Sequence, residues 1–243
     1  MPLEGETGTS RPKSMTKSAP WLLLRAGAAS AAENMAIDQA MLEATAGLGR
    51  PILRFYSWSE AAASFGYFQK YAEIERLTLL RPLVRRPTGG GLVPHAGDWT
   101  YCVAAPPGGD WYSLTAVASY ERIHDWVRRA FLQLGVVTEL APCCRVEGPG
   151  QCFVGYEKSD VLWQGLKVGG AAQRRTRAGL LIQGSVQPPP VPLARGDWEA
   201  AMVACGAAEG IQWTEFADTA EWQARVAALV AQTYGRAEFH QRR

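Results

Sequence analysis

Three consecutive prolines, Pro188–Pro190, set a boundary that no strand or helix of this chain is expected to cross. Proline lacks the backbone N–H that strands and helices donate, so the run is expected to be a connector. The sequence before it mixes strand-like and helix-like apolar spacings without an internal repeat, and the sequence after it contains two helical patterns. This arrangement predicts one α+β domain.

The positions of the expected elements follow from apolar periodicity and from turn residues. Strands are expected at 21–24, 51–57, 61–66, twice between 84 and 105, and at 160–163, 166–172 and 180–186, and helices at 34–44, 113–134, 197–206 and from 218 onward. Asn34 is the expected N-cap of the first helix, and Gly47 is expected to end it. Gly89–Gly91 are expected to join the two strands between 84 and 105, and Gln164 and Gly165 to turn a hairpin.

The expected domain runs from 19 to 234 within a chain of 243 residues. Residues 1–18 are rich in Gly, Ser, Thr, Pro and Lys and lack an apolar middle, which predicts a disordered leader rather than a secretory signal. Residues 235–243 are expected to form an exposed tail. No apolar stretch of the sequence reaches the length of a membrane span, so no membrane association is expected.

Charge and cysteine content narrow the functional classes. The net charge of +2 argues against a protein whose main role is to bind nucleic acid, because such domains carry a strong basic excess. The five cysteines are odd in number and irregularly spaced, unlike a secreted disulfide framework. We therefore expect a protein of the reducing cytoplasm. No metal-ligand spacing and no Ser/His/Asp order stands out, so no metal site is expected.

The first candidate site is the segment Arg85–His95, of sequence RRPTGGGLVPH. Consecutive glycines let backbone N–H groups approach a ligand closely, and the two arginines beside them would suit an anionic group. The segment is not a Walker A loop, and it lacks the Rossmann spacing. A flexible hairpin turn with surface arginines would account for the same residues. His95 is the one histidine placed near a candidate site.

The second candidate site pairs Cys152 with Lys167. Cys152 follows a loop rich in Gly and Pro, where a side chain can be presented to a cleft, and Lys167 lies in a Gly-rich strand that permits close approach of a substrate. A nearby ammonium lowers the pKa of a thiol and can stabilise an oxyanion. The residues themselves leave open that the thiol is only a small buried hydrophobe and the lysine only a solvated surface group.

Three blocks, in their order along the chain, resemble the biotin/lipoate protein ligase superfamily. They are NMAIDQAM at 34–41, RRPTGGG at 85–91 with Val93, His95 and Tyr101, and GLKVGGAAQ at 165–173, followed by Gly184 and Ser185. The resemblance extends over most of the chain from Trp21 to Val186. It implies the fold of the biotin/lipoate protein ligase (BPL/LPL) catalytic domain, a mixed β-sheet flanked by helices, with a narrow apolar tunnel for an eight-carbon acyl chain.

Within that superfamily, Cys152 and Lys167 are similar to the pair of the cysteine-dependent octanoyltransferases of Gram-positive type. The resemblance implies transfer of an octanoyl group from acyl carrier protein, through a cysteine thioester, to a lysine of a lipoyl domain. The acceptor would be the glycine cleavage H protein or a 2-oxoacid dehydrogenase E2, and no cofactor would be required. One alternative is a lipoate–protein ligase, whose common triple glycine this chain shares and which uses ATP and Mg to form lipoyl-AMP. A non-catalytic member that binds lipoyl domains is a third possibility.

The same resemblance implies roles for individual residues. Cys152 would be the nucleophile, and Lys167 would hold the acyl carbonyl oxygen. A further set would bind substrate or line the tunnel: Arg85, Arg86, Thr88, Gly89, Gly90, Gly91, His95, Gly169 and Gly170. Gln183 stands where many relatives carry a histidine, so the role of that histidine is not carried over to this chain.

Overall fold

The computed structural model describes residues 19–146, 153 and 155–243, so the leader expected at 1–18 lies outside the described residues. An eight-stranded sheet in the order β13-β1-β2-β6-β12-β11-β10-β7 forms the centre of the molecule. Its strands are β1 (Trp21–Ala29), β2 (Ile52–Trp58), β6 (Trp99–Ala105), β7 (Glu139–Leu140), β10 (Val161–Trp163), β11 (Leu166–Thr176), β12 (Gly179–Val186) and β13 (Trp213–Glu215). Strand β1 is parallel to both of its neighbours, and the other pairs are antiparallel, so the sheet is mixed.

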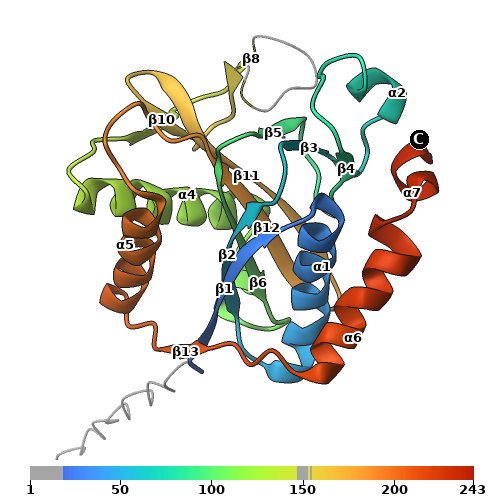
Figure 1. Cartoon of the computed structure of the whole chain (residues 1–243). Helices are drawn as coiled ribbons and strands as arrows, with labels where there is room; N and C mark the ends of the chain where they lie inside the picture. The colour runs from blue at the N-terminus through green and yellow to red at the C-terminus, as the bar shows by residue number, and fades with distance from the viewer. Residues whose placement is uncertain (1–18, 147–152, 154) are drawn as a thin grey trace, which may run out of the picture.

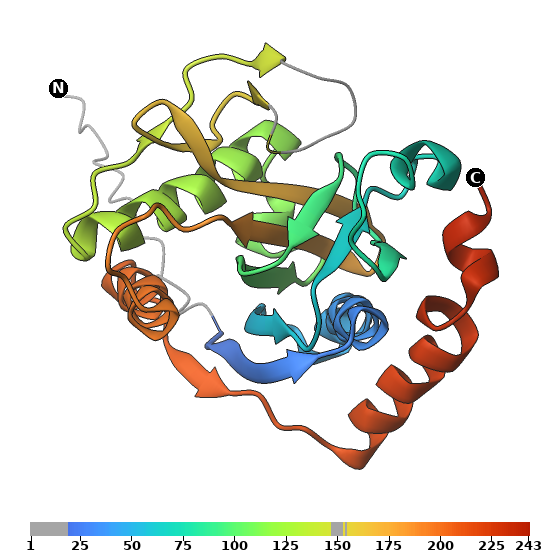
Figure 2. The same cartoon turned by 45° about the horizontal axis from the view of Figure 1, so that its top comes forward.

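Helices cover both faces of this sheet (Figures 1 and 2). Helix α1 (Ala31–Leu48) packs on one face against β2, β6 and β12, and α6 (Ala220–Leu229) lies outside α1. Helices α4 (Ala116–Gln133) and α5 (Arg195–Ala208) pack together on the other face. The remaining short elements are α2 (Tyr71–Ile74), α3 (Asp110–Ser113), the π-helical η1 (Val230–Tyr234), α7 (Ala237–Gln241) and the strand pair β8 (Arg145–Val146) and β9 (Gly155–Tyr156). No described helix has both the length and the apolar character of a membrane span.

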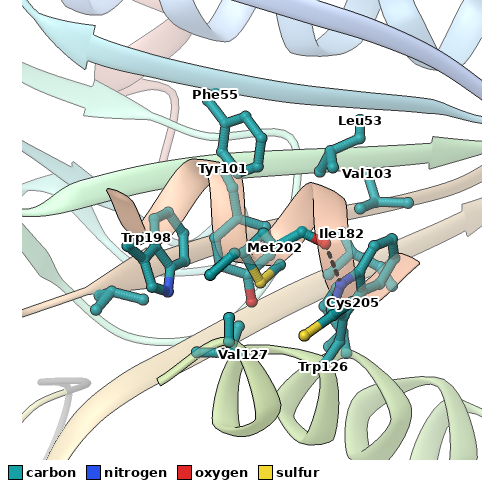
Figure 3. Close-up of a cluster of buried hydrophobic side chains, with 14 of the residues drawn as sticks. Leu53, Phe55, Tyr101, Val103, Trp126, Val127, Ile182, Trp198, Met202 and Cys205 are labelled. Atoms are coloured by element: carbon teal, nitrogen blue, oxygen red, sulfur yellow. Dashed lines mark hydrogen bonds between the residues drawn. The ribbon is translucent and has the colours of Figure 1, made fainter. Parts of the chain in front are cut away.

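Aromatic side chains fill the layer between the sheet and the α4–α5 pair (Figure 3). Trp198 of α5 is fully buried, and its ring centre lies 5.7 Å from that of Phe55 and 5.6 Å from that of Trp99. Trp126 of α4 donates its indole N–H to the carbonyl of Met202 on α5 over 2.7 Å. Each large side chain buried in this way contributes about 1.5–3 kcal/mol, so the layer gives the sheet a firm support on this face.

A three-stranded sheet beside the large one carries the glycine segment. In its order β4-β3-β5, β3 (Ala62–Phe65) separates β4 (Leu83–Arg85) from β5 (Val93–His95). Gly89–Gly91 connect two strands, β4 and β5, as expected, but these two strands do not pair with each other. Because β3 takes the place between them, β4 pairs parallel to β3 and β5 pairs antiparallel to it. The segment from 84 to 105 accordingly contains three strands, the last of which, β6, belongs to the large sheet.

The first helix begins and ends outside its expected limits. Ser30 is the N-cap: its hydroxyl accepts from the backbone N–H of Glu33 over 3.3 Å, and the Glu33 carboxylate accepts from the Ser30 N–H over 3.0 Å. This capping box satisfies two helix-end donors at once, so Asn34 is not the cap and lies fully buried inside the first turn. At the other end Gly49, rather than Gly47, has the left-handed φ of +61° that stops the helix.

The later strands follow the expectations closely. Strands β10 and β11 form the expected hairpin, and both turn residues, Gln164 and Gly165, have positive φ, +50° and +78°, as a type I′ turn requires. Strand β12 ends before Pro188–Pro190, which connect the sheet to α5. The 235–243 segment includes α7, whose half-buried His240 accepts at Nδ1 from the backbone N–H of Arg85 over 3.1 Å.

Candidate active site

A narrow pocket lies between the two sheets and brings the two candidate segments together. Its wall includes Arg86 and His95 from the first segment, and Phe153, Lys167 and Gly170 from the second. Its volume is about 40 Å³, which is room for a water molecule or two.

Lys167 is held inside this pocket by a buried carboxylate. Its Nζ lies 2.7 Å from Oδ2 of Asp160, and the exposed fractions of the two side chains are 7% and 0%. Asp160 is itself fixed, because it accepts from the hydroxyl of Tyr120 over 2.6 Å and from the backbone N–H of Glu157 over 2.7 Å. A buried ammonium requires a paired and hydrogen-bonded counter-charge, and Asp160 supplies it.

Two glycines of β11 stand where a side chain would be crowded, and Gly170 leaves the space that the Lys167 side chain occupies. A Cβ at Gly170 would lie 2.7 Å from Cε and 2.9 Å from Nζ of Lys167, which is closer than side chains pack. A Cβ at Gly169 would meet Cβ of Val161 on the neighbouring strand at 3.2 Å. The ring centre of Phe153 lies 5.1 Å from Nζ of Lys167. Cys152, the predicted nucleophile, lies outside the described residues.

Arg86 holds the glycine turn in place. Its guanidinium donates to the carbonyl oxygens of Gly89 over 3.0 Å, Gly91 over 2.7 Å and Ser64 over 3.2 Å. A Cβ at Gly66 would lie 2.0 Å from the carbonyl oxygen of Gly90, so the two backbones approach as closely as only glycine allows. Both Arg85 and Arg86 are buried, so the interpretation of this segment as a flexible turn with surface arginines is wrong.

Arg85 lies apart from the pocket. Its guanidinium is buried and donates to the carbonyl oxygens of Tyr67 over 2.8 Å, Gln69 over 2.6 Å and His240 over 2.6 Å. Burial, reinforced by the charges of Arg242 and Arg243, lowers the pKa of Arg85 to about 10. The Arg85 guanidinium therefore connects the segment after β3 to α7, whereas Arg86 lines the pocket.

His95 belongs to a hydrogen-bonded chain that the sequence did not reveal. Its Nε2 lies 2.8 Å from Oγ of Ser64, and its Nδ1 lies 2.8 Å from Oδ2 of Asp98. The hydroxyl of Ser185 donates to the same carboxylate oxygen over 2.7 Å, and the indole of Trp58 stacks on the imidazole with ring centres 3.8 Å apart. Both ring nitrogens and one ring face are thus engaged, which fixes the orientation of the imidazole at the pocket wall.

A second buried polar network includes Gln183 and Tyr56, which line the pocket. Gln183 accepts from the hydroxyl of Thr88 over 2.7 Å and donates to Oδ2 of Asp38 over 2.7 Å. Asp38 forms a fully buried ion pair with Arg54 at 2.6 Å and accepts from the hydroxyl of Tyr56 over 3.0 Å. Burial, strengthened by the Asp38 charge, raises the pKa of Tyr56, so this phenol stays a neutral donor. Thr88 is thereby connected to α1 through hydrogen bonds.

No described group of three or more His, Cys, Asp or Glu side chains is placed to hold a metal ion.

The fold is similar to that of solved lipoate protein ligases. A putative lipoate protein ligase from T. acidophilum with bound lipoic acid gives a TM-score of 0.77 at 19% identity, covering 93% of this chain and 100% of that one. A lipoate-protein ligase A bound with ATP gives a TM-score of 0.76 at 19% identity, covering 92% and 99%. The fold class that the resemblance predicted, a BPL/LPL catalytic domain with a mixed sheet and flanking helices, is therefore confirmed.

The family follows from the sequence match. Residues 30–187 match the lipoyl protein ligase A/B catalytic domain, and the chain belongs to that family. The octanoyltransferase LipM of Exiguobacterium sp. (strain AT1b) is 36% identical over 179 residues, which are 68% of this chain and 65% of the relative. The LipM of Carboxydothermus hydrogenoformans is 36% identical over 165 residues, 65% and 61% of the two chains. The chain thus spans less than two thirds of the length of these relatives.

Proposed function

We propose that this protein is an octanoyltransferase that moves an octanoyl group from acyl carrier protein to a lysine of a lipoyl domain, through a thioester on Cys152. The relatives that are 36% identical to it carry the name octanoyltransferase. The observation that carries the proposal is the placement of Lys167, whose ammonium group is held in the pocket by Asp160 at 2.7 Å. Phe153, the residue that follows Cys152 in the sequence, lines the same pocket.

In the first step, the thiolate of Cys152 attacks the carbonyl carbon of the octanoyl thioester. The carbonyl oxygen becomes an oxyanion, and the ammonium of Lys167 stabilises it by donating a hydrogen bond. The bond from carbon to the carrier sulfur then breaks, and the carrier thiol leaves with the proton that Cys152 gave up. One thioester replaces another, so this step needs no external energy source.

In the second step, the neutral amine of the acceptor lysine attacks the thioester on Cys152. The amine nitrogen loses a proton as the amide forms, and the Cys152 thiolate leaves and recovers a proton. An amide is more stable than a thioester, so the transfer is downhill without a nucleotide. The two partner proteins use one pocket in turn, which predicts ping-pong kinetics.

The other predicted site residues shape the pocket in this proposal. Arg86 and His95 belong to the wall against which the acyl chain packs, and burial contributes about 0.8 kcal/mol for each methylene. The Gly89–Gly91 turn lies next to this wall, where Arg86 holds it. Thr88 acts through Gln183, and Arg85 acts indirectly, through the backbone carbonyls that its guanidinium holds.

No cofactor takes part in the proposed reaction. We infer that the reaction takes place in the cytoplasm, where reducing conditions keep the Cys152 thiol free.

The second candidate function is an ATP-dependent lipoate–protein ligase, which the resemblance of the Gly89–Gly91 segment to ligases favours. In that reaction the turn would hold the adenylate phosphate, and Lys167 would serve equally well. Cys152 discriminates between the two, because only the transferase needs its thiol.

The test is the mass of the intact protein after mixing with octanoyl acyl carrier protein in the absence of ATP. The parent protein is expected to gain one octanoyl group that hydroxylamine removes, and Cys152→Ala is expected to gain none. Cys144→Ala is the matched control, because Cys144 is an exposed free thiol close in the sequence, and this variant should still be labelled. If the parent stays unlabelled, and an acceptor domain is modified only with ATP and free acid, the ligase function replaces the transferase.

A further inference from the structure

Arginine side chains gather around one tyrosine, Tyr67, which lies beside the glycine segment. The guanidinium carbons of Arg174, Arg242 and Arg243 lie 5.2, 4.4 and 5.9 Å from the ring centre of Tyr67. Arg85 donates to the carbonyl oxygen of the same tyrosine over 2.8 Å. The four charges come from β4, β11 and the segment around α7, which lies beside β4 and α2 (Figure 1).

These positive charges lack a carboxylate partner among the residues that the structure describes. The acidic side chains on the adjoining helices are already paired, Glu73 with Lys70 on α2 and Glu238 with Arg236 beside α7. The closeness of the arginines to one another is reflected in the lowered pKa of Arg85, to which Arg242 and Arg243 contribute after burial. Like charges assembled in this way attract an anionic partner.

Strand β11 connects the arginine cluster with the pocket wall. Successive alternate residues of a strand share one face, so Arg174 lies on the same face of β11 as Gly170 and Ala172, which line the pocket. Its guanidinium lies 3.4 Å from the carbonyl oxygen of Pro87, and the backbone N–H of Tyr67 donates to the carbonyl oxygen of Thr88 over 2.9 Å. The cluster therefore borders the glycine segment on its outer side.

An exposed aromatic ring completes this surface. Phe68 is 70% exposed, and the guanidinium carbon of Arg243 lies 5.4 Å from its ring centre. Arginine and aromatic side chains are the residues most enriched at protein–protein interfaces. Arg243 is held beside it, because the backbone N–H of Tyr71 donates to the main-chain oxygen of Arg243 over 2.9 Å.

We propose that Tyr67, Phe68, Arg174, Arg242 and Arg243 form the docking surface for the acidic carrier domain that delivers the acyl group. This inference rests on the proposed function and names the surface on which its first partner binds. A carrier must bring its thioester to Lys167 while its own body stays outside a pocket of about 40 Å³. A basic surface beside the glycine segment holds an acidic domain near the pocket and speeds its encounter.

The experiment compares three octanoyl donors in the formation of the protein thioester: the carrier protein, coenzyme A and N-acetylcysteamine. The variant is Arg242→Ser/Arg243→Ser, because both side chains are exposed and their loss leaves the core intact. The KM for the carrier is expected to rise about tenfold, with a weaker dependence on salt and with kcat nearly unchanged. The rate with the N-acetylcysteamine thioester, which has neither a phosphate nor a protein surface, is expected to stay the same.

The matched control is Arg195→Gln, which removes a positive charge at the start of α5, on the opposite face of the sheet. This variant should keep the KM of the parent for every donor. An unchanged KM and salt dependence for the carrier in the double variant would overturn the proposal. A rise for the coenzyme A donor equal to that for the carrier would overturn it in favour of a phosphate site. A parent protein that forms no thioester with any donor would refute the proposed function instead.

Discussion

Replacing Asp160 by asparagine would separate the two roles of the buried ion pair with Lys167. The substitution keeps the size of the side chain and an oxygen for the hydroxyl of Tyr120, which donates to Asp160 over 2.6 Å. It removes the negative charge that lies 2.7 Å from Nζ of Lys167, at a place where the two side chains are only 0% and 7% exposed.

The expected loss of stability is large because the remaining charge is buried. Removing one partner of a buried ion pair destabilises a protein by about 3–5 kcal/mol. Without the carboxylate that positions it, the Lys167 side chain no longer donates to the oxyanion, so the rate of thioester formation falls about 10²-fold or more. Replacing both partners, Asp160→Asn with Lys167→Met, removes the unpaired charge and should restore much of the stability, but not the activity.

The measurement is a double-mutant cycle. Urea unfolding and thioester formation are measured on the parent, on Asp160→Asn, on Lys167→Met and on the double variant. The reasoning predicts that the double variant is more stable than Asp160→Asn alone. It would be refuted if Asp160→Asn lost less than about 1 kcal/mol, or if the two single losses simply added in the double variant.

Three further expectations concern single positions. Gly170→Ala should lower the rate of thioester formation at least about tenfold, because the added Cβ would lie 2.7 Å from Cε of Lys167; a rate equal to that of the parent would contradict this. Ser30→Ala should lower the free energy of unfolding in urea by about 1 kcal/mol through loss of the capping box, whereas no loss would mean that the box is not a stabilising cap. Burial lowers the pKa of His124 from 6.5 to about 4, and the unfolded chain therefore takes up this proton at a higher pH than the folded chain. Stability should be full above about pH 6.5 and fall by about 3 kcal/mol as the pH drops to 4; an identical pH dependence in His124→Leu would contradict this assignment.

The strands that the sequence predicts well are those defined by local signals. The hairpin of β10 and β11 was predictable because Gln164 and Gly165 are the residues that a tight turn needs, and both adopt positive φ. The capping box of Ser30 and Glu33 was an equally local signal that the sequence contained, and Asn34 was wrongly preferred to it. Asn34 is used in tertiary contacts instead, donating to the carbonyl of Ser57 over 2.9 Å.

The candidate site was predictable only in part. Motifs of the family point to Lys167 and to Arg86, which both line the pocket. They do not reveal Asp160 as the counter-charge of Lys167, because a carboxylate seven residues away could equally have faced solvent. Nor do the motifs distinguish Arg86, which lines the pocket, from Arg85, whose guanidinium donates to the carbonyl oxygen of His240.

By itself, the sequence determined the fold class, the turn at 164–165 and the two segments that meet in the pocket. Each of these follows from apolar periodicity, from turn residues or from a family motif. Only the tertiary structure decided that β3 inserts between β4 and β5, and that Ser64, His95 and Asp98 form one hydrogen-bonded chain. Ser64 is 31 residues away from His95 in the sequence, and its pairing depends on burial: a polar group removed from water must find a partner wherever the packed chain places one. Local spacing carries no information about that pairing.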